Sequence, residues 1–558
     1  MTTNVQGASP RNRTTPTTSA PTLHRPPADG LAGLAAMTRL VIRRNRIRLL
    51  VWFVVIVGLF AYVGAYYKGM FTTQKALDDF AALSNTPGIK ALTGLAAAPA
   101  TLGGAVWTKI WMTCALTLAL GVVFLVTRNG RADEEVGRTE LLRSRVLGQH
   151  AYSAASWLVF AGLCVAVGLF VAVSSAGLGL DPAGGGAMGS WVVGASVTGV
   201  GLVALGIGAV AGQVASTSRG ANALGSIVVV GFYVVRLVGD LGNGALTWAS
   251  PIGWGQEMAP WGANRWWPFG LLVLLAAGLL GVAWSLEARR DYGAGLVPDR
   301  TGKADSLASY AHPLGLAARL QRGPIIGWTI AIVLTALMLG SVVNQMSNLL
   351  KDAGTSTSAI LRGTGIDALL GLMAGLVALI VTIFAIQSAT QLRADEATGI
   401  IEPQLAGAVS RKRWVLQRLA IPTIGAAVLL ALGGWVMGAV YGSTVKDASQ
   451  GFRIAGATLA YFPAVMVLVG VAILLFGFVP RLTIPVTWGV VAGLWLIMLI
   501  GDALHLPTWV LKVLPFSATP DLPAQAMRWS PLIVMTLVAS AMIWVGLQRF
   551  ADRDIQPG

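Results

Sequence analysis

A ten-residue motif occurs twice in this chain, with four charged residues of the same type at the same spacing. The first copy reads R-A-D-E-E-V-G-R-T-E at residues 131–140, and the second reads R-A-D-E-A-T-G-I-I-E at residues 393–402. The shared pattern is R-A-D-E-x-x-G-x-x-E, and the second copy begins 262 residues after the first. Self-similarity at a fixed offset indicates that the chain consists of two related halves.

Other landmarks recur at nearly the same offset and in the same order. Each half carries a Gly-Asp pair, an Arg-Asp pair and two prolines at matching places. The pairs are Gly239-Asp240 with Gly501-Asp502, Arg290-Asp291 with Arg553-Asp554, and Pro251 and Pro268 with Pro515 and Pro531. Their common order favours a duplication over a chance match of one motif.

The sequence around these landmarks is poor in charge. Of 558 residues, 55% are hydrophobic and 11% are charged, whereas soluble domains carry about 25% charged residues. Twelve apolar segments approach or exceed the roughly 20 residues that a membrane span needs. They are 49–67, 105–127, 152–174, 190–214, 221–239 and 267–287 in the first half, and 325–346, 366–389, 414–440, 453–478, 483–503 and 530–548 in the second.

We therefore predict an all-α polytopic membrane protein with twelve transmembrane helices in two parallel six-helix repeats. The repeats are parallel because six spans, an even number, give both halves the same topology. The predicted units are a disordered cytoplasmic tail at 1–30, a first half at 31–290, a cytoplasmic linker at 291–306 and a second half at 307–558. The tail is rich in Ser, Thr, Pro and Arg and cannot bury a core.

Positive charge predicts the orientation. The formal net charge is +16, and 28 of the 40 Lys and Arg residues fall in segments that are cytoplasmic if both termini are. By the positive-inside rule, this distribution predicts a multi-pass protein of the plasma (inner) membrane with both termini in the cytoplasm. No basic domain of any size is present, so the lipid bilayer and not nucleic acid is the expected partner.

A basic, amphipathic stretch precedes the first span. Leu34 and Val41 fall on one helical face, whereas Arg39, Arg43 and Arg46 take another. This pattern predicts a helix at the membrane surface that leads into the span. A similar basic stretch, 320–328, leads into the second half.

Each copy of the repeated motif, taken as one helix, places its Asp, Gly and last Glu on one face. The Arg and the first Glu are i, i+3 neighbours and can pair. Two interpretations compete: a solvated loop that anchors the topology, and a short cytoplasmic docking helix with an acidic stripe around a small residue. The repetition of all four charges favours docking. The candidate docking residues are Arg131, Asp133, Glu134, Gly137, Glu140, Arg393, Asp395, Glu396, Gly399 and Glu402.

The segment R-A-D-E-E-V-G-R-T-E-L-L resembles the cytosolic coupling region of ABC-2 type exporter permeases. The twofold arrangement is similar to the permeases in which two six-span halves are fused, the tetronasin-type or multidrug efflux ABC transporter membrane subunits. The resemblance extends from about residue 31 to the end and implies that each half has a cytoplasmic coupling helix. The second copy departs from the first: Ile400 replaces Arg138, and Pro403 is expected to end or kink the helix. We expect unequal docking by the two copies.

The source of energy is expected to lie outside the chain. The spans carry almost no carboxylates of the kind that proton-coupled transporters need, and no G-x-x-x-x-G-K-[ST] phosphate-binding loop is present. We expect the permease of an ATP-driven exporter that moves amphipathic or hydrophobic compounds, such as antibiotics and drugs, out of the cell. Two coupling elements imply two copies of a separate ATPase subunit, which bind ATP and Mg. No catalytic residue and no cofactor are expected in this chain.

The alternative is a twelve-span proton-coupled secondary drug transporter of the major facilitator type. That family shares the six-plus-six topology and carries a charged signature in the matching loop. The Asp–Arg core of that signature is missing here.

Arg236 lies in an apolar segment and has two interpretations. It pairs with Asp240 at i+4 near the outer surface, or it faces a substrate path and binds an anionic group; Met498 stands at the matching place in the second half. By analogy with the resembled family, the second and fifth spans line the pathway, and ordinary packing or lipid-facing aromatics explain the same pattern. The candidate path residues are Trp111, Phe232, Tyr233, Arg236, Trp488 and Trp495.

Cysteine and histidine give no sign of a metal centre or a disulfide framework. The two cysteines, Cys114 and Cys164, lie inside apolar runs, and the four histidines are scattered without ligand spacing. We expect no metal site.

Overall fold

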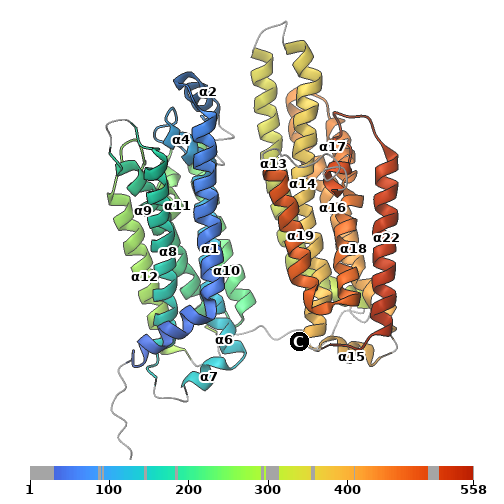
Figure 1. Ribbon diagram of the computed structural model, residues 1–558, viewed down its shortest axis with the longest axis horizontal. Helices are drawn as coiled ribbons and strands as arrows, with labels where there is room; N and C mark the ends of the chain where they lie inside the picture. The colour runs from blue at the N-terminus through green and yellow to red at the C-terminus, as the bar shows by residue number, and fades with distance from the viewer. Residues whose placement is uncertain are drawn as a thin grey trace, which may run out of the picture. The chain divides into compact units, whose positions relative to one another are not determined.

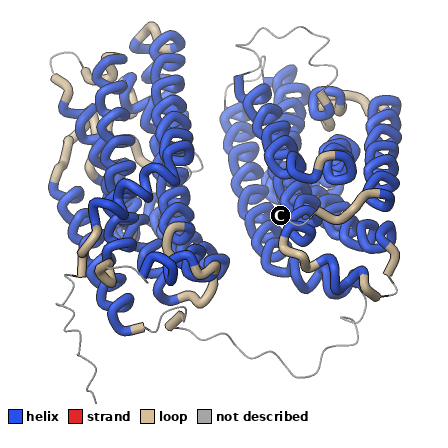
Figure 2. Tube along the Cα trace, turned by 60° about the horizontal axis from the view of Figure 1, so that its bottom comes forward, coloured by secondary structure: helices blue, strands red, loops and turns tan. Residues whose placement is uncertain are grey.

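The computed structural model describes residues 30–85, 90, 93–143, 147–182, 186–290, 295–296, 313–352, 358–407, 409–500 and 514–556. Every regular element within these ranges is a helix (Figure 2). The chain divides into two compact units, Met1–Arg300 and Thr301–Gly558. Nearly all of the predicted tail and linker, and the Gly501-Asp502 landmark, lie outside the described residues, so the predicted unit boundaries stay predictions.

The first unit is a bundle of long helices with shorter helices at its two ends (Figure 1). The long helices are α1 (Leu34–Met70), α5 (Met112–Arg128), α8 (Ala151–Leu178), α9 (Met188–Val214), α10 (Ser218–Leu241) and α12 (Trp267–Arg289). The short ones are α2 (Gln74–Ser84), α4 (Leu102–Val106), the π-helix η1 (Trp107–Trp111), α6 (Arg131–Glu135), α7 (Arg138–Arg143), the 3₁₀-helix η2 (Ala245–Ala249) and α11 (Pro251–Glu257).

The second unit is a bundle of the same kind. Its long helices are α13 (Pro313–Asp352), α14 (Ser358–Ala397), α16 (Arg411–Val445), α18 (Phe462–Phe478), α19 (Pro480–Ile500) and α22 (Trp529–Asp552). Its short helices are α15 (Ile401–Leu405), α17 (Gln450–Leu459) and α21 (Pro515–Ala518).

Eleven helices among the described residues are long and apolar enough to cross a membrane, six in the first unit and five in the second. Each overlaps one predicted span. The remaining predicted span, 483–503, falls on α19 and on three residues beyond it that are not described. The all-helical, multi-span fold is therefore confirmed, whereas the count of twelve spans stays a prediction.

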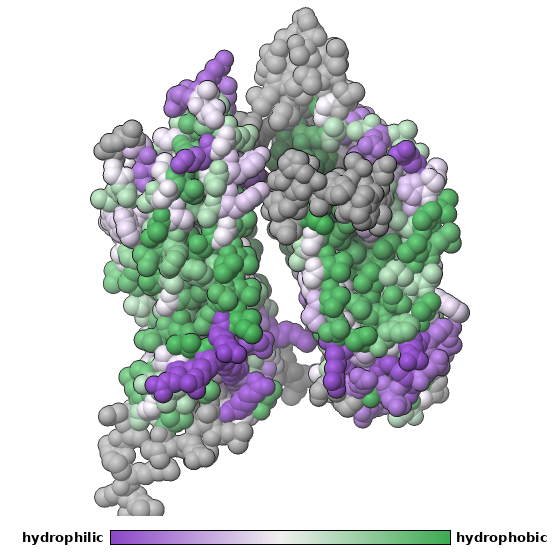
Figure 3. Space-filling model, in the orientation of Figure 1, coloured by the Kyte–Doolittle hydropathy of each residue, from purple (hydrophilic) through white to green (hydrophobic). Residues whose placement is uncertain are grey.

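A central helix organises the core of each unit. In the first unit this is α9, which packs against α5, α8, α10 and α12, and most of its residues are buried. In the second unit α14 packs against α13, α16, α18 and α19. The peripheral helices keep large apolar side chains on the surface, such as Leu274 on α12 and Leu537 on α22. These side chains form the apolar belt visible on each unit in Figure 3, as expected for a surface that faces lipid.

The predicted amphipathic stretch at the start of each half is not a separate helix. Residues 34–48 are the first turns of α1, which continues into the apolar span without a break, and α13 likewise runs through Pro324. The first turns of α1, which contain Arg39, Arg43 and Arg46, run across the lower end of the first unit at an angle to the rest of the helix, near α6 and α7 (Figure 1). The prediction of a helix that leads into the span is confirmed, since α1 is unbroken from Leu34 to Met70, and its location at the membrane surface stays a prediction.

The second span of the first unit contains a feature that the sequence did not signal. Residues Trp107–Trp111 form a π-helix between α4 and α5, and the Trp107 and Trp111 rings stack with centroids 4.1 Å apart. In a π-helix the side chains four apart shift relative to an α-helix, and such turns are rare. Apolar periodicity alone cannot reveal one extra residue in a turn.

Close approach of helices depends on glycine at a few crossings. At the α18–α22 crossing, a Cβ on Gly477 would lie 2.5 Å from the Gly546 carbonyl oxygen, and one on Gly546 would lie 2.5 Å from the Ile473 carbonyl oxygen. Real Cβ atoms do not approach a backbone oxygen this closely, so these two backbones can touch only because both residues lack a side chain.

Replacing Gly546 by Ala is therefore expected to destabilise the second unit by about 1–3 kcal/mol, because the added methyl group overpacks the crossing. The measurement is the midpoint of thermal unfolding of the detergent-solubilised chain. Gly489→Ala on α19 is the control, since a Cβ there meets nothing within 4 Å and Ala favours a helix. Equal midpoints for the two variants would contradict the close crossing.

Candidate functional site

The repeated motif contains a helix break at its glycine in both copies. Gly137 and Gly399 have φ values of +69° and +73°, in the left-handed region that favours glycine. Their N–H groups donate to the carbonyls of Glu134 (3.0 Å) and Glu396 (3.1 Å), which closes the preceding helix. The prediction of one continuous helix across each motif is wrong because this left-handed turn redirects the chain before the last Glu.

Pro403 does not end or kink a helix as the sequence suggested. It lies in the first turn of α15, which continues to Leu405. A helix leaves its first N–H groups without an internal partner, so a proline there removes no hydrogen bond.

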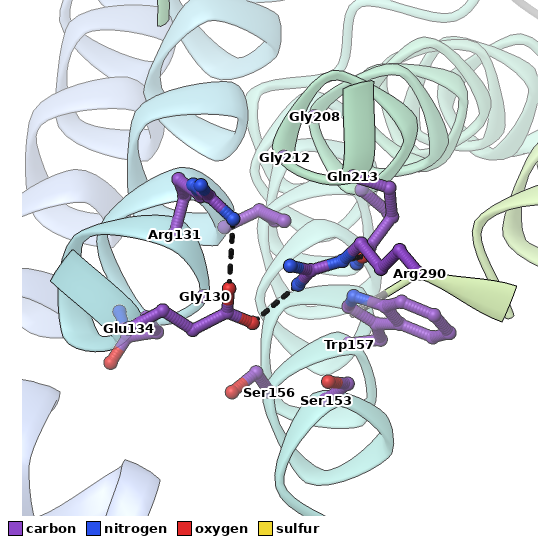
Figure 4. Close-up of a pocket in the computed structure, with 13 residues that line it drawn as sticks. Gly130, Arg131, Glu134, Ser153, Ser156, Trp157, Gly208, Gly212, Gln213 and Arg290 are labelled. Atoms are coloured by element: carbon purple, nitrogen blue, oxygen red, sulfur yellow. Dashed lines mark hydrogen bonds and ion pairs between the residues drawn. The ribbon is translucent and has the colours of Figure 1, made fainter. Parts of the chain in front are cut away.

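In the first unit, the motif glutamate is held between two guanidinium groups. Arg131 donates to Glu134 across 3.0 Å, as the i, i+3 spacing predicted, and Arg290 from the end of α12 pairs with the other carboxylate oxygen (Figure 4). The Nε of Arg131 also donates to the Ser216 carbonyl at 2.7 Å, just beyond α9. The Glu134 side chain is 9% exposed. This arrangement, which we call the first clasp, joins α6 to the ends of α9 and α12.

The second unit has the same arrangement, the second clasp. Arg393 donates to Glu396 across 3.1 Å, and Arg553, just beyond α22, approaches the two carboxylate oxygens at 2.6 and 3.0 Å. The backbone N–H of Gln556 adds a further bond of 3.0 Å to this carboxylate, which is fully buried. The Arg553 guanidinium also lies 5.1 Å from the centroid of the Phe550 ring.

Sequence reasoning identified Arg290 and Arg553 only as landmarks of the repeat. It did not connect them to the motif glutamates, which lie 156 and 157 residues away. The matching positions of Arg290 and Arg553 in the two halves could have revealed this role. A charged residue that recurs at the same place in both halves of a membrane protein is expected to have an equivalent partner in each.

The motif aspartate of the first unit is bound by residues from two other helices. Arg44 on α1 forms two hydrogen bonds of 2.6 Å with the Asp133 carboxylate, and Tyr152 on α8 donates to it at 2.7 Å. Arg138 approaches the same carboxylate at 3.2 Å. Asp133 is 1% exposed, so its charge serves internal pairing.

The motif aspartate of the second unit has a different partner. Asp395 pairs with Arg418 on α16 and accepts a 3.0 Å bond from Gln391. Arg418 stands 262 residues after Ser156, which in the first unit borders a cavity of about 20 Å³ next to the first clasp (Figure 4). The buried Ser156 hydroxyl has no partner among the described residues, and the cavity has room for one water molecule. A guanidinium in one half thus replaces a small polar cavity in the other.

The predicted acidic stripe is therefore not on the surface. The third and fourth motif residues of both copies point into their own unit, where each has an arginine partner. Of the acidic residues that both copies share, only the last, Glu140 and Glu402, is exposed; Glu135, which the second copy lacks, is also exposed and bonds Ser218. Neutral and basic neighbours share this surface: Val136 and Arg138 in the first copy, and Ile400 in the second. Whether any of the ten residues couples to a partner stays a prediction.

Arg236 is enclosed and paired. It contacts Asp240 at 2.8 Å and Gln256 of α11 at 3.1 Å, and the Tyr233 ring lies 5.6 Å from its guanidinium carbon. Asp240 also accepts a 2.8 Å bond from Thr247 of η2. The predicted Arg236–Asp240 ion pair is confirmed. A role in a substrate path remains a prediction, and the side chain has no exposed surface here.

The other candidate path residues are spread over three helices. Trp111 is fully buried and donates to Ser196 at 2.6 Å. Phe232 and Tyr233 on α10 and Trp488 and Trp495 on α19 are partly buried against the core of their own unit. Packing accounts for all five, and their role in transport stays a prediction.

The described residues contain no candidate metal site. In these ranges no group of three or more His, Cys, Asp or Glu residues is placed to hold a metal ion, and Cys114 and Cys164 are buried free thiols.

An all-helical, multi-pass membrane protein with a duplicated ion-paired loop element is the class that this fold and site define. Residues 310–551 match the family described as multidrug efflux system permease Rv1217c, C-terminal domain. The chain is also 32% identical over 545 residues to the multidrug efflux system permease protein Rv1217c of Mycobacterium tuberculosis (strain ATCC 25618 / H37Rv). The match covers 96% of this chain and 98% of that protein. The chain belongs to the family of this multidrug efflux permease, which confirms the resemblance found in the sequence.

Removing Arg290 is expected to destabilise the first unit by about 3–5 kcal/mol, because Arg290→Ala leaves the nearly buried Glu134 carboxylate short of one partner. Arg553→Ala is expected to destabilise the second unit by a similar amount, because it removes one partner of the buried Glu396 carboxylate. Thermal unfolding of the solubilised chain measures both. Glu134→Gln in the Arg290→Ala background should recover part of the loss, because it removes the uncompensated charge.

The control for Arg290→Ala is Arg289→Ala, which removes the adjacent, exposed arginine. If both variants unfold at the wild-type midpoint, the first clasp does not stabilise the unit.

Proposed function

We propose that this chain is the membrane-spanning subunit of an ATP-driven exporter of amphipathic or hydrophobic drugs. Two separate ATPase subunits bind ATP and Mg and act on the permease through the two motif loops. The chain has twelve spans, six per half in parallel repeat, with both termini in the cytoplasm. The name of the relative, a multidrug efflux permease, supports the substrate class and the direction of transport.

One observation carries this proposal: both motif loops are fixed to their bundles by the same clasp. In each unit, the clasp links the end of the second span to the end of the sixth. A force applied to the loop is therefore transmitted to two spans at once, because buried ion pairs resist separation. A loop that only anchored the topology would need no such connection in both halves.

The surface that remains outside each clasp is small and differs between the copies. The first presents Glu135, Val136, Arg138 and Glu140, and the second presents Thr398, Ile400 and Glu402. Because only the last glutamate is common to both, it is the best single position at which to test docking in both halves.

Charge reversal at both exposed glutamates, Glu140→Lys with Glu402→Lys, is expected to reduce ATP-dependent efflux on the order of tenfold, as expected for the loss of about 1.4 kcal/mol of docking free energy. The assay co-expresses the chain with the ATPase encoded beside its gene and follows efflux of a fluorescent amphipathic dye. Membrane insertion and thermal stability should stay at wild-type values because both side chains are exposed.

The matched control is Asp79→Lys on α2, an exposed acid beyond the far end of α1. A loss of efflux in this control equal to that in the double variant would show a general charge effect and argue against docking by the motif loops.

A proton-coupled mechanism can be tested at Glu287. This buried carboxylate on α12 contacts His150 at 3.1 Å and accepts a 2.7 Å bond from Ser153. We expect Glu287→Gln to retain efflux within about twofold, since the amide keeps the shape of the site and its oxygen still accepts from Ser153. Efflux that disappears in this variant, or that collapses with the proton gradient while ATP stays high, would favour the secondary transporter.

A further inference from the structure

Four arginines lie close together at the base of the first unit, and two of them pair with one carboxylate. Arg44 and Arg138 both pair with Asp133. Arg128, the last residue of α5, interacts electrostatically with these two arginines, with Asp133 and with Arg48. We call Arg44, Arg48, Arg128 and Arg138 the arginine cluster.

Buried amides hold part of this cluster in place. Asn45 is fully buried and donates to Asn129 across 2.8 Å, which joins α1 to the end of α5. The Asn45 side-chain oxygen accepts a 3.3 Å bond from Arg48. Arg48 bonds Asn45, and Arg128 precedes Asn129 in the chain. The contact between the two amides therefore brings these two arginines close to each other.

The cluster carries uncompensated charge. Four guanidinium groups and one carboxylate leave a net charge of +3, and Arg48 and Arg128 form no ion pair with a described residue. The cluster is open to the surroundings: Arg128 is exposed, and the side chains of Arg44 and Arg138 are 28% and 63% exposed. Like charges at this spacing repel, so a bound anion would stabilise the arrangement.

The second unit shows that the fold does not require the cluster. When Trp52 is matched with Trp328, and the motifs with each other, the four arginines correspond to Leu320, Pro324, Thr390 and Ile400. A different polar contact joins the two helices there, because Gln321, at the place of Asn45, accepts a hydrogen bond from Ser388 on α14. The second half thus lacks all four arginines but keeps its clasp. The arginine cluster is therefore not needed for the clasp, which indicates a separate role for the cluster in the first half.

The neighbouring surface is typical of the level of lipid headgroups. On α1 the exposed arginines Arg43 and Arg46 alternate with exposed aliphatic residues, Ile47 (68% exposed) and Leu50 (61%), just before the apolar span. Figure 3 shows the strongly hydrophilic surface at the lower end of the first unit, directly below the apolar belt. Arginines over aliphatic side chains at the end of a span lie where phosphates of the bilayer lie.

We propose that the arginine cluster is a binding site for the headgroup of an anionic phospholipid, present in the first half only. Guanidinium groups donate paired, charge-assisted hydrogen bonds to phosphate oxygens. The aliphatic residues of α1 contact the acyl chains. Asp133 keeps Arg44 and Arg138 apart and oriented, so that Arg48 and Arg128 provide the donors with the fewest internal partners.

The test measures lipid binding to the purified full chain by native mass spectrometry in detergent. Phosphatidylglycerol and phosphatidylcholine with identical acyl chains are titrated separately. The wild type is expected to bind at least one phosphatidylglycerol about tenfold more tightly than phosphatidylcholine. The double variant Arg48→Gln with Arg128→Gln leaves the Asp133 pairs intact and should lose most of this preference.

The matched control is Arg413→Gln with Arg481→Gln, which removes two exposed arginines of the second unit that pair with no described residue. It should keep the preference. Absence of any preference in the wild type, or equal loss in both double variants, would overturn the proposal. If the first double variant instead keeps the lipid preference but no longer captures the co-expressed ATPase, the cluster binds protein and the proposal is wrong.

Folding of the variants is checked by thermal unfolding. If the double glutamine variant is unstable, Arg128→Thr and Arg138→Ile provide the comparison, because these are the residues at the matching positions of the second unit. Either one should weaken phosphatidylglycerol binding several-fold and leave phosphatidylcholine binding unchanged; unchanged binding of both lipids would contradict the site.

Discussion

A buried carboxylate between two guanidinium groups determines how each half is assembled at its motif end. Glu134 and Glu396 each accept from an arginine three residues earlier and from an arginine at the end of the sixth helix. Removing such charges from water costs several kcal/mol per ion, and their mutual attraction repays most of that cost. The net stabilisation is therefore modest. The important consequence is geometric, because a carboxylate in this position satisfies its charge only when the second and sixth helices end side by side.

The glycine in the left-handed conformation allows one motif to bury its first acidic residues and expose its last glutamate. The residues before Gly137 and Gly399 belong to α6 and α14, and the motif aspartate and first glutamate on these helices point inward. Residues after the glycine start a new helix in another direction, so that Glu140 and Glu402 reach the surface. A side chain with a Cβ at these φ values would be strained, so the glycine is needed for this backbone conformation.

The sequence predicts the parts of this structure that depend on local spacing. Apolar segments located the membrane helices, and i, i+3 and i, i+4 spacing predicted the Arg131–Glu134 and Arg236–Asp240 pairs. The rest depends on tertiary contact. Neither the meeting of Glu134 with Arg290 nor that of Asp133 with Arg44 follows from a periodicity, since 156 and 89 residues separate them. The predicted acidic stripe was wrong for the same reason. Helical periodicity assumes one continuous helix and cannot show that its charged side chains pair with residues far away in the sequence.

The comparison of the halves separates what the fold requires from what it permits. The clasp is the same in both, whereas the aspartate one position earlier takes its arginine from α1 in the first half and from α16 in the second. In the second half the partner of this aspartate lies on α16, and the four positions that match the arginine cluster carry no charge. The two halves therefore share a framework at the base of the bundle, but they differ in how the helix that enters the membrane first is attached to it. In an exporter driven through these loops, movement of the first loop would also move α1 through the Arg44–Asp133 pair, whereas movement of the second would act on α16. The asymmetry of the halves thus lies in the attachment of their helices as much as in their exposed surfaces.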